Sequence, residues 1–112
     1  MSGDALRRYA ADLVSESKTL TNRASQVVRK VAFDTEADAK RLAPVDTGLL
    51  ENSITTITSN GGLTATVIAT ASYAEYVELG TSRMAPQPFM GPATDRNTPV
   101  FYEAMAALAG GD

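Results

Sequence analysis

The chain of 112 residues contains no cysteine, no histidine and no tryptophan. Without cysteine there are no disulfides, thiolate nucleophiles or thiolate zinc ligands, and without histidine the usual general base is missing. The glycine-rich motifs of nucleotide binding and the serine motif of acyl transfer are also absent. No run of about 18 apolar residues is present, which is the length a membrane-spanning helix requires. We therefore expect no enzymatic activity, no cofactor, no metal and no membrane partner.

Positive charge is scarce in the second half of the chain. Residues 1–43 carry 8 Lys and Arg against 6 Asp and Glu, whereas residues 44–112 carry 2 against 7. This acidity argues against a phosphate-binding surface in the second half, because nucleic-acid affinity comes mainly from basic side chains. The N-terminus lacks the apolar segment of a signal peptide, so we expect the protein to be made and kept in a cytosol or in an assembly built there.

The length and the 44% hydrophobic content are ordinary for one domain with a modest core, which a partner subunit would help to stabilise. We expect a single domain over 1–112, with a helical arm at 1–22 and a flexible tail at 110–112. The predicted class is α+β: a long N-terminal helix packed on a small antiparallel β-sheet formed by a central hairpin, a short helix and a C-terminal helix.

A helical pattern stops and a β pattern begins within Ala43–Ser53, which reads A-P-V-D-T-G-L-L-E-N-S. Pro44 cannot continue a helix, because it lacks the N–H and its ring clashes with the preceding turn. Asp46, Thr47 and Gly48 then supply turn chemistry: two side-chain acceptors and a residue that tolerates positive φ. A ligand or metal cradle is the alternative interpretation, but a cap and a tight turn account for every residue.

Before this turn, small and apolar residues recur at spacings of three and four, which predicts a helix over 24–42 and a helical arm before it. Thr19, Thr21 and Asn22 have low helix propensity, so one long helix and two shorter ones are both open. The stripe is either the face of a helix lying on the sheet, which we favour, or a coiled-coil seam. Its members are Leu6, Ala10, Leu13, Ser17, Leu20, Ala24, Val27, Val31 and Leu42.

After the turn, residues 48–52 can form a helical turn, and residues 53–59 are rich in β-branched side chains. Asn60-Gly61-Gly62 is a hairpin signal, because Asn-Gly accepts the positive φ of a tight turn, and residues 63–71 alternate as a return strand. A two-residue loop would bury Ile54, and one more loop residue would bury Ile57 instead. The sequence leaves this register open.

Ser72 and Glu75 have the spacing of a capping box, which predicts a short helix over 73–79 that Gly80 ends. The segment T-S-R-M-A-P-Q-P-F-M-G-P follows, and its prolines favour an extended loop of fixed course. Thr98-Pro99 has the pattern of a helix start, so we expect the last helix over 99–109.

Three features suggest association with other chains: two tyrosines on the short helix, the proline-rich loop and the free edge of the hairpin. For Phe89 alone we favour the alternative that it packs under its own sheet. The candidate subunit or neighbour interface is Tyr73, Tyr76, Met84, Pro86, Pro88 and Phe89.

Three blocks occur in order: A-P-V-D-T-G-L-L-E-N-S, Y-A-E-Y-V-E-L-G-T and P-Q-P-F-M-G-P-A. Over residues 31–93 the chain resembles the small neck or tail-completion proteins of long-tailed bacteriophages, a head–tail joining family. The resemblance implies a structural virion protein, one copy of a homo-oligomeric ring in the neck, assembled in the bacterial cytoplasm. Implied partners are portal, adaptor or stopper proteins on the head side and tail terminator or tail tube proteins on the tail side. After Phe89 the chain departs from the family, because Gly91, Pro92 and Asn97-Thr98-Pro99 interrupt its long charged helix.

Genomic DNA would pass through the lumen of such a ring without specific binding, and acidic side chains suit that need because they repel phosphate. Candidate channel-lining residues are Glu51, Glu75, Glu78 and Glu103. A tail terminator that caps the tail tube is a close alternative. A small nucleic-acid-binding regulator is a remote one, suggested by basic residues in the helical half that interspersed acidic residues offset.

Overall fold

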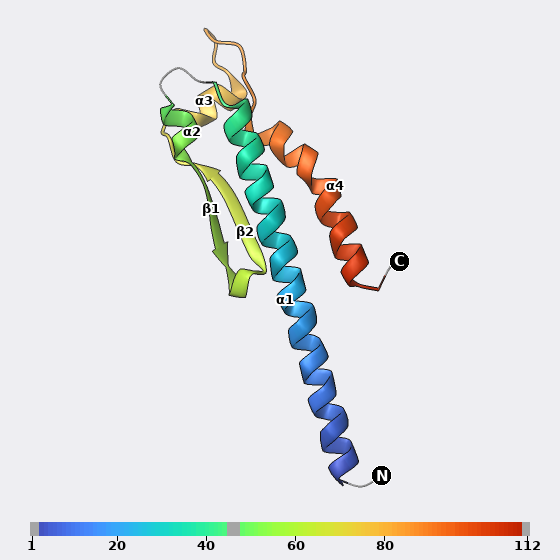
Figure 1. Cartoon of the computed structure of the whole chain (residues 1–112). Coiled ribbons are helices and arrows are strands. Elements are labelled where there is room, and N and C mark those ends of the chain that lie inside the picture. Colours follow the sequence, from blue (N-terminus) through green and yellow to red (C-terminus); the bar gives the residue numbers. More distant parts are fainter. Residues whose placement is uncertain (1–2, 45–47, 111–112) are drawn as a thin grey trace.

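The computed structural model describes residues 3–44 and 48–110 and confirms the predicted α+β class (Figure 1). A long N-terminal helix forms the axis, a two-stranded antiparallel sheet lies along one side of it, and a C-terminal helix runs back along another. No described helix is long and apolar enough to cross a membrane. The elements are α1 (Gly3–Leu42), α2 (Leu49–Ser53), β1 (Ile54–Ser59), a 3₁₀ turn η1 (Asn60–Gly62), β2 (Thr64–Ala69), α3 (Ala74–Leu79) and α4 (Met90–Leu108).

Helix α1 is one uninterrupted helix of 40 residues, so the alternative of two shorter helices is wrong. The hydroxyl of Thr19 donates to the carbonyl of Ser15 at 3.1 Å, which satisfies this low-propensity residue within the helix. The helix ends at Leu42, two residues before Pro44, as predicted. All residues from 3 to 23 are exposed, and we call this segment the arm.

The arm makes the molecule long and thin. The whole molecule measures 75 × 26 × 20 Å along its principal axes, and its radius of gyration is 20.0 Å. A compact chain of this length would have a radius of gyration of about 13 Å. The 21 residues of the arm, at about 1.5 Å per residue, account for roughly 30 Å of the long axis.

The hairpin pairs Ile54 with Ala69 and Ser59 with Thr64, so its loop has four residues, 60–63. Asn60 and Gly61 both have positive φ, 54° and 65°, as the turn signal predicts. This loop is two residues longer than the two-residue loop considered from the sequence. Because side chains in a strand alternate with a period of two, the same residues still face the core. Ile54 is therefore buried, at 2% exposure, and Ile57 is 52% exposed.

The core lies where the last turns of α1 meet α2, the hairpin, α3 and the start of α4. Phe89 and Ile54 are its largest fully buried side chains. Alanines 39 and 93 face the core from α1 and α4 with no exposed surface, which allows the two helices to pack closely. The remaining buried apolar residues of this cluster are Ala43, Leu50 and Ala74.

The last helix begins at Met90, so the prediction of a start at Pro99 is wrong. Its N-terminus is stabilised from a distance: the Glu78 carboxylate accepts hydrogen bonds from the backbone N–H groups of Phe89, Met90 and Gly91 at 3.1, 2.9 and 3.1 Å. Pro92 stands in the first turn, where a missing N–H costs nothing. The helix therefore follows Phe89 directly, and the interruption expected after that residue is absent.

Pro99 is accommodated inside α4, although an interior proline costs about 3 kcal/mol in an isolated helix. The preceding residues bond to their own helix: the Thr98 hydroxyl donates to the carbonyl of Thr94 at 2.7 Å, and the Asn97 amide donates to the carbonyl of Ala93 at 2.8 Å. Packing along α1 supplies the stabilisation that local propensity lacks.

The capping box at the start of α3 is also a wrong prediction. The helix begins at Ala74 with no side-chain hydrogen bond at its N-cap, Tyr73. The Ala74 N–H donates to the carbonyl of Ala71 at 3.0 Å, so a backbone turn already satisfies this group. The predicted end at Gly80 is confirmed, with φ 77° and ψ 175°, a conformation essentially confined to glycine.

Candidate interaction surfaces

One candidate surface, which we call the loop end, consists of residues 73–88, which include α3. Figure 1 shows α3 beside the end of α1 that is opposite the arm, and the loop after α3 projecting beyond that end. The loop is folded onto α3, because Thr81 and Met84 pair across a tight turn and the Gln87 N–H donates to the carbonyl of Val77 at 2.8 Å. Five of the predicted interface residues are exposed here: Tyr73, Tyr76, Met84, Pro86 and Pro88.

Phe89, the sixth residue of the predicted interface, is only 1% exposed and lies in the core. In the single chain, Phe89 therefore packs in the core beneath the hairpin, which is the alternative favoured for this residue from the sequence. The loop end presents prolines, tyrosines and a methionine, all of which suit contacts with another protein.

The predicted structural turn is described at three of its five positions. Pro44 follows the end of α1, Gly48 precedes α2 with φ 78°, and Gly80 ends α3. Asp46 and Thr47 lie outside the described residues.

The four acidic candidates for a channel lining are not gathered together. Glu51 in α2 and Glu75 in α3 lie at the same end of the molecule, whereas Glu103 is near the far end of α4. Glu78 is half-buried, and both of its carboxylate oxygens accept backbone N–H groups at the start of α4. Its structural role was missed from the sequence, because its partners stand 11 to 13 residues away.

A polar cluster joins α1 to α4 around Asp38. The Asn97 amide donates to this carboxylate at 2.8 Å, Arg41 lies at 2.8 Å and Arg96 at 3.8 Å. These groups hold the pKa of Asp38 below its ordinary value, the Asn97 hydrogen bond first and the Arg41 hydrogen bond next. No local motif indicates this cluster, since Asn97 is 59 residues from Asp38.

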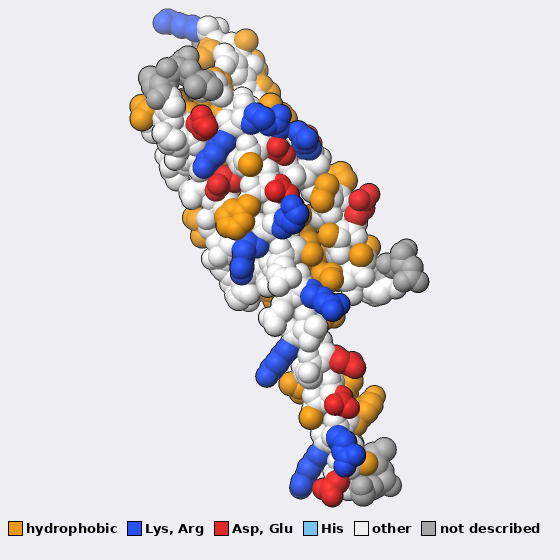
Figure 2. All heavy atoms as spheres, viewed as in Figure 1, with side chains coloured by type: hydrophobic (Ala, Val, Ile, Leu, Met, Phe, Trp, Pro, Cys, Tyr) orange, Lys and Arg blue, Asp and Glu red, His pale blue; other side chains and the backbone are white. Residues whose placement is uncertain are grey.

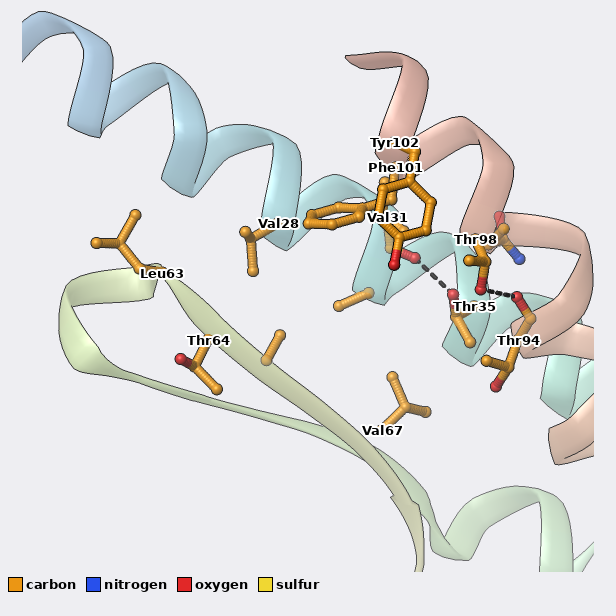
Figure 3. Close-up of a pocket in the computed structure, with 13 residues that line it drawn as sticks. Val28, Val31, Thr35, Leu63, Thr64, Val67, Thr94, Thr98, Phe101 and Tyr102 are labelled. Carbon is orange, nitrogen blue, oxygen red and sulfur yellow. Dashed lines mark hydrogen bonds between the residues drawn. The ribbon is translucent and has the colours of Figure 1, made fainter. Parts of the chain in front are cut away.

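An open groove of about 480 Å³ lies between α1, β2 and α4 (Figure 3). Val28 and Val31 of α1 form its floor, Leu63 stands at the hairpin side, and Phe101 and Tyr102 stand at the α4 side. None of the lining side chains is charged. The hydroxyls of Thr35 and Thr98 donate to carbonyls of their own helices. A group that binds in the groove therefore does not need to accept hydrogen bonds from them.

The arm carries a second apolar surface. Leu6, Tyr9, Leu13, Val14 and Leu20 are each at least 48% exposed. Figure 2 shows hydrophobic side chains interspersed with charged ones along this thin part of the molecule. The helical stripe predicted from the sequence therefore continues beyond the sheet and α4. Within the packed part of α1, Val31 is only half-buried and Leu42 is 41% exposed, and the buried residues Ala32, Thr35 and Ala39 lie outside the predicted stripe.

These features are exposed apolar surfaces, and prolines, tyrosines and leucines of this kind suit contacts with other proteins. Within the described ranges, no group of three or more acidic side chains is placed to hold a metal ion. The fold and its surfaces define a class of small, elongated α+β proteins with exposed apolar contact regions at both ends of one long helix.

A protein-family model described as "Bacteriophage HK97-gp10, putative tail-component" matches residues 4–80. The chain belongs to this HK97-gp10-like family, because the match covers more than half of it, from the arm to the end of α3. The match confirms the resemblance to a head–tail joining family of long-tailed phages, and it indicates a phage tail component located in the virion in contact with other virion proteins. No match to the chain is found among curated proteins or among solved structures.

Proposed function

We propose that the protein is a ring subunit of the neck of a long-tailed phage and joins the head to the tail by completing the tail. One observation supports this role beyond family membership: the loop end and the arm lie at opposite ends of a 75 Å molecule, and both expose apolar side chains. A subunit between two layers of a virion needs contact surfaces that face in opposite directions.

Electron microscopy of particles made with and without the gene tests this proposal. Without the protein, we expect filled heads and tails of normal length that do not unite, and supplying the protein in trans should restore joining. If the protein is instead a tail terminator, tails of uncontrolled length should appear, because an uncapped tube continues to add subunits. Infectious particles that form in its absence would contradict both roles.

Glu51 and Glu75 are the proposed channel-lining pair at one end of the subunit, and Glu103 is a more distant candidate. Their negative charge would keep DNA from binding to the ring as it passes. Glu78 can contribute charge there only while it also holds the start of α4, so replacing it would confound the test. We expect Glu51→Lys and Glu75→Lys together to slow DNA ejection from assembled particles, and Asp95→Lys, an exposed change in α4, to leave it normal. Unchanged ejection from the double variant would contradict the channel assignment.

The remote alternative, a nucleic-acid-binding regulator, gains little from the structure. Three basic residues of α1 are paired with acidic neighbours on the same helix: Lys30 with Asp34 at 2.9 Å, Arg41 with Asp38 at 2.8 Å and Lys40 with Glu36 at 3.4 Å. A gel-shift experiment at physiological salt distinguishes this role, because binding by basic side chains would give a shift.

A further inference from the structure

We propose that the free protein forms an antiparallel, two-fold symmetric dimer in which the two α1 helices pair along their arms and the tip of each arm enters the groove of the other copy. The observation behind this is continuity: Val31 in the groove floor belongs to the apolar stripe of α1 that the arm exposes, and Val28 lies one helical turn before it. The inference concerns the protein before assembly and does not depend on its place in the virion.

The arm is complementary to itself in side-chain size. Large residues recur every seven positions at Leu6, Leu13, Leu20 and Val27, and small residues stand four positions after the first three, at Ala10, Ser17 and Ala24. When two such helices run antiparallel, one register places Leu13 opposite Ala24, Leu20 opposite Ser17 and Val27 opposite Ala10. Large side chains then fill the space left by small ones along the whole arm.

The same register brings the arm tip to the groove. Leu6 of one copy lies opposite Val31 of the other, between the hairpin side chain Leu63 and the α4 side chain Phe101 (Figure 3). The uncharged groove suits a leucine, and its opening toward solvent leaves room for an approaching helix. Because the pairing is isologous, the arms and grooves of both copies are covered by one set of contacts.

Charge is also complementary in this register. Helical spacing places Asp12, Glu16 and Arg23 along one edge of the stripe. In the antiparallel pair, Arg23 of one copy is level with Val14 of the other, midway between Asp12 and Glu16. These two carboxylates therefore face a cation across the pair, which favours this register and direction over others.

Sedimentation equilibrium tests the dimer. The wild-type protein should sediment as a dimer, and Leu13→Asp should raise the dimer dissociation constant at least about a hundredfold, because a carboxylate would be buried opposite Ala24. Ser15→Asp places the same charge on the opposite face of the arm and should leave the dimer intact. Circular dichroism checks that both variants keep their helix. A wild-type protein that remains monomeric, or a dimer unaffected by Leu13→Asp, would overturn the proposal.

Disulfide trapping tests the direction of pairing. Because the natural chain has no cysteine, the introduced cysteines are the only ones that can form a disulfide. Leu13→Cys and Ala24→Cys are purified separately and mixed under oxidising conditions. Antiparallel pairing predicts that the mixed disulfide forms faster than either self-linked product. Faster linkage of Leu13→Cys to itself would indicate parallel helices and reject this arrangement.

Discussion

The two halves of α1 both present small and apolar residues at helical spacing, but they have different surroundings. The second half is enclosed by the hairpin and α4, and its most buried residues are small ones, Ala32, Thr35 and Ala39. The arm has leucines and a tyrosine at its exposed positions, and no other described part of the chain covers them. The comparison teaches that periodicity predicts that a face is buried, whereas side-chain size indicates how closely the covering element approaches.

The largest contrast between the packed core around the second half of α1 and the exposed arm should appear on truncation of an apolar side chain. Phe89→Ala removes the largest buried side chain of the core and should lower the free energy of unfolding by about 3 to 5 kcal/mol. Leu6→Ala in the arm should change it by less than about 0.5 kcal/mol in the monomer. Urea denaturation at protein concentrations where only monomer is present makes the measurement. Equal losses in the two variants would show that the core and the arm do not differ in this respect.

A second contrast concerns two glycines of positive φ, one in the packed loop end and one at the open hairpin tip. A Cβ at Gly80 would lie 2.8 Å from both the Met84 carbonyl oxygen and the Pro86 nitrogen, whereas at Gly61 it would meet nothing within 4 Å. We expect Gly80→Ala to cost about 3 kcal/mol, from backbone strain and the clash together, and Gly61→Ala about 1 kcal/mol. Thermal unfolding distinguishes them, and similar melting temperatures would contradict the close packing of this loop.

Most of the fold could be predicted from the sequence, because its signals are local. The end of α1 before Pro44, the positive φ at Asn60 and Gly61, and the end of α3 at Gly80 each depend on a few adjacent residues. The start of α4 could not be predicted, since Thr98-Pro99 is a strong local start signal and the competing cap on Met90 comes from Glu78, far along the chain. The candidate surfaces show the same division between local and long-range signals. The exposure of Tyr76 and Pro88 could be predicted from the local sequence, whereas the groove could not, because it brings Val31 of α1 and Phe101 of α4 together with the hairpin.

The long-range cap itself can be measured. Glu78→Gln keeps the shape of the side chain but replaces one acceptor oxygen with an NH2 group, which cannot accept, so the hydrogen bond to either Met90 or Gly91 is lost. The change also removes a negative charge from the positive end of the α4 dipole. We expect a loss of about 1 to 2 kcal/mol in the free energy of unfolding, together with faster hydrogen exchange at the start of α4. Glu75→Gln, an exposed change in the preceding helix, is the matched control and should have little effect. Unaltered exchange in Glu78→Gln would mean that α4 is held by packing alone.

The smallest predicted effect is a pH dependence that belongs to the packed half. Asp38 has a lowered pKa in the folded protein, chiefly because Asn97 donates to its carboxylate and Arg41 lies beside it. The ordinary pKa of an aspartate is about 3.8, so as pH falls below that value the unfolded chain binds the proton before the folded protein does. The contribution of Asp38 to the free energy of unfolding is therefore complete above that pH and is lost as pH approaches the lower pKa of the folded protein. Asp38→Asn should therefore reduce stability at neutral pH and flatten its decline in acid. Asp12→Asn removes one carboxylate from the arm instead. Denaturation across this pH range, at protein concentrations where only monomer is present, should show the wild-type decline retained, because the Asp38 cluster is intact.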